Sequence, residues 1–506
     1  MTVSSLKPTI LLTGATGLLG RFVLARLLQD RQDVVVLVRG APHESAHQKV
    51  EAALTAFEKL CWLPRPRVVI GDLSNNRLSL TDDDLHYLAS RPLQIIHCAA
   101  SIRFQRDEAT DEPYRTNVQG TRHLLQLCEQ WQVTAFHYVS TAYVGSRSPL
   151  ASLPERLTTT DDMGGNDYEN SKIMAEQLVA DSTHLGHKTI HRPSIIVGDS
   201  QSGFTSTFHG FYAPLHIGYQ LAAQFGFAPE AGNWFRQQLD MRADDSKNLV
   251  PVNWVAEVIV RTVQSEAATP GENGEARVFH WTNPHPVPCG SLQDAIVAAI
   301  GQEFSARQPH TPSHSQSAVS SADFRQLMQV YEAYFNCDPT FDNSRARATC
   351  PQLPCPVVDS ELLKKLADFA IAHNFGWPKV KLSVVPHSAL RTALRELPPT
   401  VEPHKFCFEL RLLGPGALEL LRFTRVAGRW HALDGKEGAL TNHNGATPPA
   451  SLTIPMDTLA DCFNGKTSLA LAFEQGCCIM EGQLPEDWLA LIEHWMEDIR
   501  TRIVHA

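Results

Sequence analysis

The stretch "TGATGLLGRFVLARLL", Thr13–Leu28, places three glycines within seven residues and then continues as an apolar helical pattern. The residues before it, "TILL", have the composition of a buried strand. Gly14 can make a sharp strand-to-helix turn, Gly17 lets the backbone approach a diphosphate, and Gly20 lets the helix pack closely on the strand. Because a helix N-terminus attracts anions, the stretch predicts a dinucleotide-binding unit. A tight turn that holds no ligand is the alternative.

The first third of the chain repeats this alternation of strand and helix patterns. The candidate strands are "TILLTG", "DVVVLVRG", "PRVVIGDL", "LQIIHCAA", "AFHYVS" and "KTIHRPSIIVG". The candidate helices between them are "RFVLARLLQD", "HQKVEAALTAFEKL", "GTRHLLQLCEQW" and "SKIMAEQLVADS". Such alternation predicts a doubly wound α/β fold, with a parallel sheet, right-handed crossovers and helices on both faces.

The length of 506 residues predicts more than one domain, because single cores stop growing at ~250–300 residues. We expect a dinucleotide-binding core at 1–200, a substrate-binding part at 201–378 and an α+β domain at 379–506. In the middle part, "NLVPVNWVAEVIVRTV" and "CGSLQDAIVAAIG" predict helices, and the Ser-, His- and Pro-rich segment 306–323 predicts a flexible loop or lid. In the last part, "HKFCFELRLLGPGALELLRFTRVAGRWHAL" predicts antiparallel hairpins.

Composition narrows the class of protein. A formal net charge of -10 disfavours a nucleic-acid partner, because phosphate binding needs a basic surface. The start of the chain has too short an apolar run for a signal peptide, and nothing elsewhere approaches a membrane span. The 11 cysteines form an odd set without metal-ligand spacing. We therefore expect a cytoplasmic protein with no disulfide framework and no metal site.

Two strand ends carry residues suited to the adenosine half of a cofactor. Arg39 ends "VVVLVRG", where an acidic residue would hold a ribose hydroxyl; a cation there suits the 2′-phosphate of NADP, and Lys49 can assist from the next helix. Asp72 in "VIGDL" is placed to meet an adenine through its side chain or a neighbouring amide. A solvated surface arginine and a plain turn aspartate are the alternatives.

Thr141, Tyr168 and Lys172 form the strongest candidate for a catalytic group. "VSTAYVG" puts Ser140 and Thr141 at the end of a strand, and "YENSK" puts Tyr168 and Lys172 one turn apart on one helix face. Tyrosine is a poor acid–base group at neutral pH unless a nearby cation stabilises its phenolate. Lys172 supplies that cation, and the Thr141 hydroxyl can hold the substrate oxygen.

These motifs resemble the extended short-chain dehydrogenases/reductases. "LVRG", "VSTAYVG", "HRPSIIVGDSQSG" and "NLVPVNWVAEVIV" are similar, more specifically, to the fatty acyl-CoA reductase and thioester reductase branch with its male-sterility-type NAD-binding domain, over residues 8–375. Leu18 departs from the aromatic residue that this branch often has, which weakens the match to eukaryotic fatty acyl reductases. The resemblance implies a Rossmann sheet and NADPH-dependent reduction of an acyl thioester, with acyl-CoA and acyl-carrier protein both open as donors.

The resemblance also implies roles for individual residues. Thr141, Tyr168 and Lys172 would be catalytic. The residues assigned to NADPH are Gly14, Thr16, Gly17, Leu18, Leu19, Arg39, Lys49, Asp72, Leu73, Ala99, Ser140, Lys172, Pro193 and Ser194. Gly20 completes the glycine turn. The product would be an aldehyde, or an alcohol after a second hydride transfer. The acyl group would be long, and the sequence does not determine its chain length.

The C-terminal part is similar, more faintly, to sterol-carrier-protein-2-like domains. The order of strand, helices, strand and closing helix in "ASLTIPMDTLADCFNGKTSLALAFEQGCCIMEGQLPEDWLALIEHW" carries this resemblance, which implies an apolar tunnel for an acyl chain. A small packing or oligomerisation domain is the alternative. Leu489, Ile492, Trp495 and Met496 form a helical stripe that we expect in a core, with peripheral lipid contact as the other reading.

Other functions share these features. A hydroxysteroid dehydrogenase or a sugar-nucleotide epimerase would carry the same glycines and the same catalytic residues, and the sterol-carrier-like tail would suit a steroid. The chain would also fit a protein that holds NADP and lipid without turnover. The intact Thr141, Tyr168 and Lys172 favour an enzyme, because a binding protein needs no acid–base tyrosine.

Overall fold

The computed structural model divides into two compact units, 1–38 with 69–379 and 39–68 with 380–506. The described residues are 7–40, 46–55, 57, 63–148, 150, 152–158, 164–225, 242–243, 245–265, 274–306, 338–376, 399–400, 407–414, 417–426, 429–433, 450–463, 469, 472, 478–481, 492, 494–496 and 499. Each unit is described here by itself.

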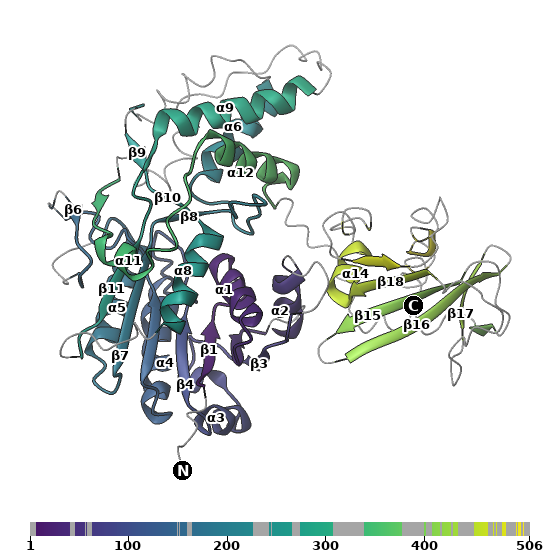
Figure 1. Cartoon of the computed structure of the whole chain (residues 1–506), viewed down its shortest axis with the longest axis horizontal. Helices are drawn as coiled ribbons and strands as arrows, with labels where there is room; N and C mark the ends of the chain where they lie inside the picture. Colours follow the sequence, from purple (N-terminus) through teal and green to yellow (C-terminus); the bar gives the residue numbers. More distant parts are fainter. Residues whose placement is uncertain are drawn as a thin grey trace. The chain divides into compact units, whose positions relative to one another are not determined.

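A seven-stranded sheet lies at the centre of the first unit (Figure 1). Its strands, in spatial order, are β11 (Arg277–Trp281), β7 (His187–Pro193), β5 (Ala135–Val139), β4 (Leu93–His97), β1 (Thr9–Thr13), β2 (Val34–Val38) and β3 (Arg67–Ile70). Each pair from β11 to β2 is parallel. The central strands β1, β2 and β4 are buried along their whole length, as parallel strands covered on both faces must be. The predicted doubly wound α/β fold is confirmed.

Helices cover this sheet in two packed pairs, α1 with α8 and α4 with α5. Their bounds, with that of the neighbouring α3, are α1 (Leu18–Gln29), α3 (Asp82–Ala89), α4 (Gly120–Gln130), α5 (Asp167–Asp181) and α8 (Val252–Gln264). The helix α2 (Ala46–Thr55) belongs to the second unit. Short 3-10 and π-helical turns occur at Asn76–Ser79 and Arg115–Gln119. The predicted strands and the helices between them are present, whereas α3 and the seventh strand, β11, were not anticipated.

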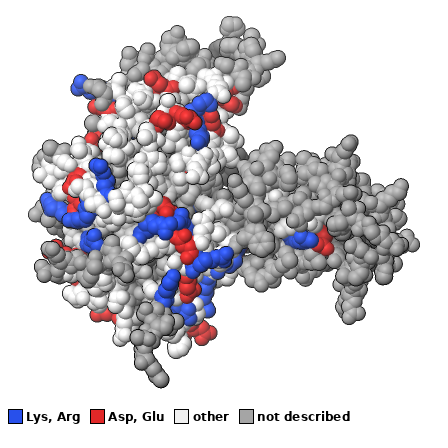
Figure 2. All heavy atoms as spheres, viewed as in Figure 1, with Lys and Arg blue, Asp and Glu red and all other residues white. Residues whose placement is uncertain are grey.

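Charged groups line the outer edge where α1 meets α8. Arg26 on α1 pairs with Glu257 on α8 at 2.7 Å, and Arg261 lies 3.7 Å from Asp30. Figure 2 shows that basic and acidic side chains of the described residues intermingle on the face it presents. Such partly exposed pairs contribute at most about 1 kcal/mol each, so the buried apolar faces of these helices hold them in place.

The segment "KTIHRPSIIVG" forms two strands rather than the single predicted one. Pro193 ends β7, and Ile195–Val197 forms β8, which pairs with β10 (Leu249–Pro251) outside the main sheet. Between them, Ser194 donates its hydroxyl to Asn248 at 2.7 Å. Because proline supplies no backbone N–H for a ladder, the chain can leave the main sheet at this point.

The described residues among 201–376 of the first unit form mainly helices. Besides α8, they are α6 (Tyr212–Phe225), α9 (Cys289–Ala306), α11 (Ser344–Thr349) and α12 (Ser360–Ala372), with a 3-10 turn at Asn374–Gly376. Short strand pairs join β9 (Ser246–Lys247) to β12 (Val287–Pro288) and β6 (Ser152–Leu153) to β13 (Thr340–Phe341). The helices predicted in "NLVPVNWVAEVIVRTV" and "CGSLQDAIVAAIG" are confirmed as α8 and α9. The predicted loop or lid at 306–323 lies outside the described residues, apart from Ala306 at the end of α9.

The second unit contains a six-stranded mixed sheet. Its spatial order is β14 (Pro399–Thr400), β17 (Arg429–Leu433), β16 (Ala417–Val426), β15 (Cys407–Gly414), β18 (Ala450–Pro455) and β19 (Ile479–Glu481), and α14 spans Met456–Phe463. The predicted antiparallel hairpins are confirmed between β15 and β16 and between β16 and β17. Ile492, Trp495 and Met496 are buried in this core, as expected for the closing stripe, whereas Leu489 lies outside the described residues. No helix among the described residues of either unit is long and apolar enough to cross a membrane.

Two neutral histidines lie inside the first unit. His97 meets the hydroxyls of Thr13 at 2.6 Å and Thr121 at 3.1 Å, and His137 lies 2.9 Å from Gln94. Both rings are about 1% exposed, and burial lowers the pKa of each to about 3. Protonation below pH 6.5 therefore favours the unfolded chain, whose histidines have ordinary pKa values.

Acidification from pH 7 to pH 5 is expected to lower the free energy of unfolding by about 2 kcal/mol for each of these two histidines. The unfolded state binds more protons throughout this window, so the stability falls as the pH falls. Urea unfolding at the two pH values measures the loss. The variant His137→Asn removes one titrating ring and should lose less stability over the same window. Equal stability of the wild type at both pH values would contradict the expectation.

Candidate active site

The glycine turn between β1 and α1 is as tight as the sequence predicts. Gly14 has a φ of +73°, and a Cβ at this residue would lie 2.6 Å from the Ala99 nitrogen. A Cβ at Gly20 would overlap the Gly14 carbonyl, lying 2.6 Å from its carbon. Gly17 caps α1 without any side-chain hydrogen bond. The turn therefore brings backbone with no side chain at Gly14 and Gly17 to the N-terminus of α1, which is the cradle that a diphosphate requires.

The remaining residues predicted around this turn have structural partners. The Ala99 N–H donates to the Thr13 hydroxyl at 3.2 Å, and the Thr16 carbonyl accepts from Arg21 at 3.0 Å. The Asp72 carboxylate accepts from the Ser74 N–H at 2.9 Å, as a turn aspartate does. The Leu73 carbonyl lies 3.0 Å from the imidazole of His123 on α4.

Arg39 and Lys49 belong to the second compact unit. Arg39 directly follows β2 and is exposed. Lys49, on α2, donates its ammonium to the Arg39 carbonyl oxygen at a distance of 2.8 Å. The structure thus brings these two predicted residues together through the Arg39 backbone.

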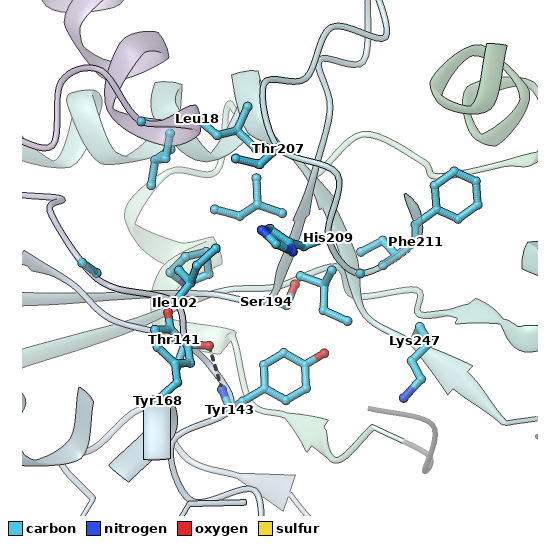
Figure 3. Close-up of a pocket in the computed structure, with 18 of the residues that line it drawn as sticks. Leu18, Ile102, Thr141, Tyr143, Tyr168, Ser194, Thr207, His209, Phe211 and Lys247 are labelled. Carbon is cyan, nitrogen blue, oxygen red and sulfur yellow. Dashed lines mark hydrogen bonds between the residues drawn. The ribbon is translucent and has the colours of Figure 1, made fainter. Parts of the chain in front are cut away.

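A cavity of about 480 Å³ opens beside the glycine turn (Figure 3). The predicted site residues that line it are Gly14, Gly17, Leu18, Leu19, Ser140, Thr141, Tyr168, Lys172, Pro193 and Ser194, together with Gly20. The predicted residues absent from its lining are Thr16, Arg39, Lys49, Asp72, Leu73 and Ala99. The glycine turn and all three candidate catalytic residues therefore face one space.

The ends of β5 and the start of α5 position the candidate catalytic side chains. Thr141 follows β5, and its hydroxyl accepts from the Tyr143 N–H at 3.3 Å (Figure 3). Tyr168 lies in the first turn of α5, a helix that Asn166 caps by accepting from the Glu169 N–H at 2.9 Å. Lys172, one turn further on, is 1% exposed and donates to the Val139 carbonyl at 2.6 Å. Helix geometry and a strand-end carbonyl thus fix both α5 residues.

The pKa shifts of Tyr168 and Lys172 differ from those expected from the sequence. Burial lowers the pKa of Lys172 to about 7, against the opposing charges of Glu176 and Cys98. Burial, with a smaller effect from Glu169, raises the pKa of Tyr168 well above its usual value. The sequence predicted that Lys172 would lower the pKa of Tyr168, and this is wrong for the structure described. Its ammonium instead bonds the Val139 carbonyl and lies 4.2 Å from the centre of the Tyr138 ring.

Asn117 connects the segment that carries the cavity-lining residue Ile102 to α5. Its amide oxygen accepts from the Ser101 N–H at 2.7 Å, and its amide nitrogen donates to the Ser101 carbonyl at 2.9 Å. The same nitrogen donates to the Ser171 hydroxyl at 2.8 Å, which in turn donates to the Tyr168 carbonyl at 2.7 Å. The segment that carries the rim residue Ile102 is thereby fixed to the turn of α5 that carries Tyr168.

One buried hydroxyl in the cavity wall points to a ligand. Ser140 is 3% exposed, and its hydroxyl oxygen has no hydrogen-bond partner among the described residues. Leaving a buried polar group unpaired costs about 1–3 kcal/mol, which a bound polar molecule recovers. Together with the backbone cradle at Gly14–Gly20, this donor fits a dinucleotide that runs from the helix N-terminus toward Thr141.

Sequence reasoning missed much of the cavity wall. The additional side chains labelled in Figure 3 are Ile102, Tyr143, Thr207, His209, Phe211 and Lys247. Tyr143 lies inside the quoted "VSTAYVG" motif, so its spacing from Thr141 was a usable signal. The others come from loops and from β9, where no local pattern marks a residue that faces a cavity.

Comparison with known proteins assigns the chain to a family. Residues 12–259 match the family model described as male sterility protein. The chain is 33% identical to human fatty acyl-CoA reductase 2 over 370 residues, which cover 64% of this chain and 69% of the relative. It is 29% identical to the L-2-aminoadipate reductase large subunit of Penicillium chrysogenum over 283 residues, or 52% of this chain and 19% of the relative.

A solved structure shares the fold. The terminal R domain from the myxalamid PKS-NRPS biosynthetic pathway aligns with a TM-score of 0.58 at 23% identity, covering 74% of this chain and 93% of the domain. The chain spans only 19% to 24% of the first three curated relatives it matches. With the human relative covered over most of its length, the chain belongs to the male-sterility-type NAD-binding family of extended short-chain dehydrogenases/reductases, whose members include the fatty acyl-CoA reductases.

Proposed function

We propose that the protein is an NADPH-dependent reductase of acyl thioesters, with acyl-CoA or acyl-carrier protein as donor and an aldehyde as product. The observation that carries the proposal is the single cavity that joins the glycine turn to Thr141, Tyr168 and Lys172. A bound nicotinamide cofactor would supply the hydride. The apolar side chains of Leu249, Leu292 and Ile296 in the same cavity suit a long hydrocarbon chain.

The chain's own residues would stabilise the charge that develops on the substrate oxygen. The hydroxyls of Thr141 and Tyr168 donate to the thioester carbonyl oxygen as it gains the electron pair of its double bond. Because the pKa of Tyr168 is raised, its phenol stays protonated at neutral pH and can pass the proton to that oxygen. Lys172, with a pKa of about 7, can hold or release a proton one helical turn away.

The hemithioacetal formed in this way would then collapse. Its carbon–sulfur bond breaks, the carbonyl forms again as the hydroxyl proton returns to the site, and the sulfur leaves as a thiol after taking up a proton. The products are an aldehyde and the free thiol of the donor. A second hydride transfer, with Tyr168 again giving the proton, would reduce the aldehyde to an alcohol.

The finer parts of the proposal rest on sequence. Arg39, exposed after β2, supports a preference for the 2′-phosphate of NADPH. The resemblance of residues 379–506 to sterol-carrier-protein-2-like domains supports an acyl-binding role for the second unit, and composition supports a cytoplasmic location.

The proposal is tested by NADPH oxidation with acyl-CoA thioesters of increasing chain length and with acylated carrier protein. We expect turnover that rises with chain length, with an aldehyde or alcohol identified by mass spectrometry. Parallel runs with NADH measure the cofactor preference, and ketosteroids provide the competing substrate class. Turnover of ketosteroids without turnover of any thioester would replace the proposal with a hydroxysteroid dehydrogenase.

A further inference from the structure

Three buried side chains form a polar cluster in the wall of the cavity. The Tyr143 hydroxyl donates to the Asp338 carboxylate at 2.6 Å, and the Lys247 ammonium lies 3.0 Å from the other oxygen of that carboxylate. The Asn248 N–H also donates to Asp338, at 2.7 Å. Tyr143 is 6% exposed, and the side chains of Lys247 and Asp338 are 7% and 5% exposed. The cluster is therefore fixed and almost shielded from water.

Tyr143 and Lys247 both line the cavity, whereas Asp338 holds them from behind. The surrounding lining is apolar and includes Ile195, Leu249 and Leu292. Removing a charged pair from water is costly, and its mutual attraction often only balances that cost. A hydrocarbon chain that faced this cluster would form no hydrogen bonds with it. The presence of the cluster in the cavity wall therefore points to a ligand atom that forms hydrogen bonds.

The cluster lies away from the reacting carbonyl. Figure 3 shows Lys247 on the Phe211 side of the cavity, opposite Leu18 and Ile102, with Tyr143 between Thr141 and Lys247. Ile102 is 47% exposed and marks the open rim near Thr141. A thioester whose carbonyl meets Thr141 and Tyr168 and whose thiol arm leaves by this rim would direct its acyl group past Tyr143 toward Lys247.

We propose that Tyr143 and Lys247 form a subsite for a neutral oxygen-bearing group, such as a hydroxyl or an oxo group, on the acyl chain of the substrate. This rests on the thioester reduction proposed above. The Tyr143 hydroxyl gives its only proton to Asp338, so its oxygen can accept from a ligand, and the Lys247 ammonium can donate to one. The pair therefore suits an alcohol, which donates and accepts, and a ketone can accept from Lys247. A carboxylate is disfavoured because Asp338 already balances the charge of Lys247. Asp338 is a positioning residue that fixes both side chains.

The test compares CoA thioesters of one chain length that carry no substituent or a single hydroxyl at successive carbons. The wild type is expected to prefer one hydroxylated isomer by about tenfold in kcat/KM, the size of one hydrogen bond to a charged group. Tyr143→Phe and Lys247→Met should each reduce that ratio toward one. Leu292→Ala, an apolar-wall control, should weaken both substrates alike and leave the ratio unchanged.

Because the ratio is taken within each variant, a partial loss of folded protein cancels. Calorimetric titration of the same thioesters gives the preference as a ratio of Kd values and does not depend on turnover. Equal affinity of the wild type for all isomers, or variants that keep the wild-type ratio, would overturn the subsite. Absence of turnover together with a preference in Kd would refute the proposed reduction while leaving the subsite supported.

Discussion

Replacement of Tyr168 by Phe is expected to lower the rate of thioester reduction by about 10²–10⁴-fold, the range for loss of a positioned general acid. Only the hydroxyl is removed, and the ring keeps its edge-on contact with Phe104, whose centre lies 6.2 Å away. Since Tyr168 faces the cavity together with Thr141, the lost group is the one placed to give a proton to the substrate oxygen. Binding of the cofactor should change little.

Single-turnover reduction of an acyl-CoA, with NADPH affinity measured separately by fluorescence, separates these two effects. Tyr87→Phe is a matched control, because it removes a hydroxyl from a tyrosine on α3 that does not line the cavity. A Tyr168→Phe variant with the wild-type rate would mean that another group protonates the substrate oxygen. A variant that loses rate and NADPH affinity equally would assign Tyr168 to cofactor binding.

The substitution Gly20→Ala is expected to cause a large loss of cofactor binding. The added Cβ would overlap the Gly14 carbonyl and lie 3.1 Å from the Ala15 Cα. Neither backbone group can move without shifting the start of α1 away from β1. Overpacking of this kind costs about 1–3 kcal/mol, and displacement of the helix N-terminus removes the cradle for the diphosphate.

Equilibrium binding of NADPH and the thermal midpoint of unfolding measure the two consequences. We expect at least a tenfold rise in Kd, which corresponds to about 1.4 kcal/mol. Gly186→Ala is the matched control, since its Cβ would lie 3.7 Å from the Thr134 carbonyl oxygen, an ordinary contact. Unchanged affinity in Gly20→Ala would show that the cofactor does not depend on the close packing of α1 against β1.

Local patterns of apolar and polar residues predicted most of the fold. Each parallel strand reads as an apolar run because helices bury both of its faces, and each predicted helix has its own periodic stripe. β11 was missed because its five residues, Arg277–Trp281, acquire their role only by pairing with β7. The single strand predicted through "KTIHRPSIIVG" ends at Pro193, which supplies no backbone N–H. The next residue, Ser194, bonds Asn248, a residue 54 positions away.

The features of the candidate site also fall into those set by local sequence and those set by long-range contacts. The sequence by itself determined the glycine turn and the spacing of Tyr168 and Lys172, because both depend on contacts within a few residues of one turn or one helix. Only the tertiary structure decided that Lys172 bonds the Val139 carbonyl and that burial sets the pKa of Tyr168. It likewise decided that Asp338 reaches Tyr143 across 195 residues. Long-range packing determines desolvation and contacts of this kind, and no local pattern of residues encodes them.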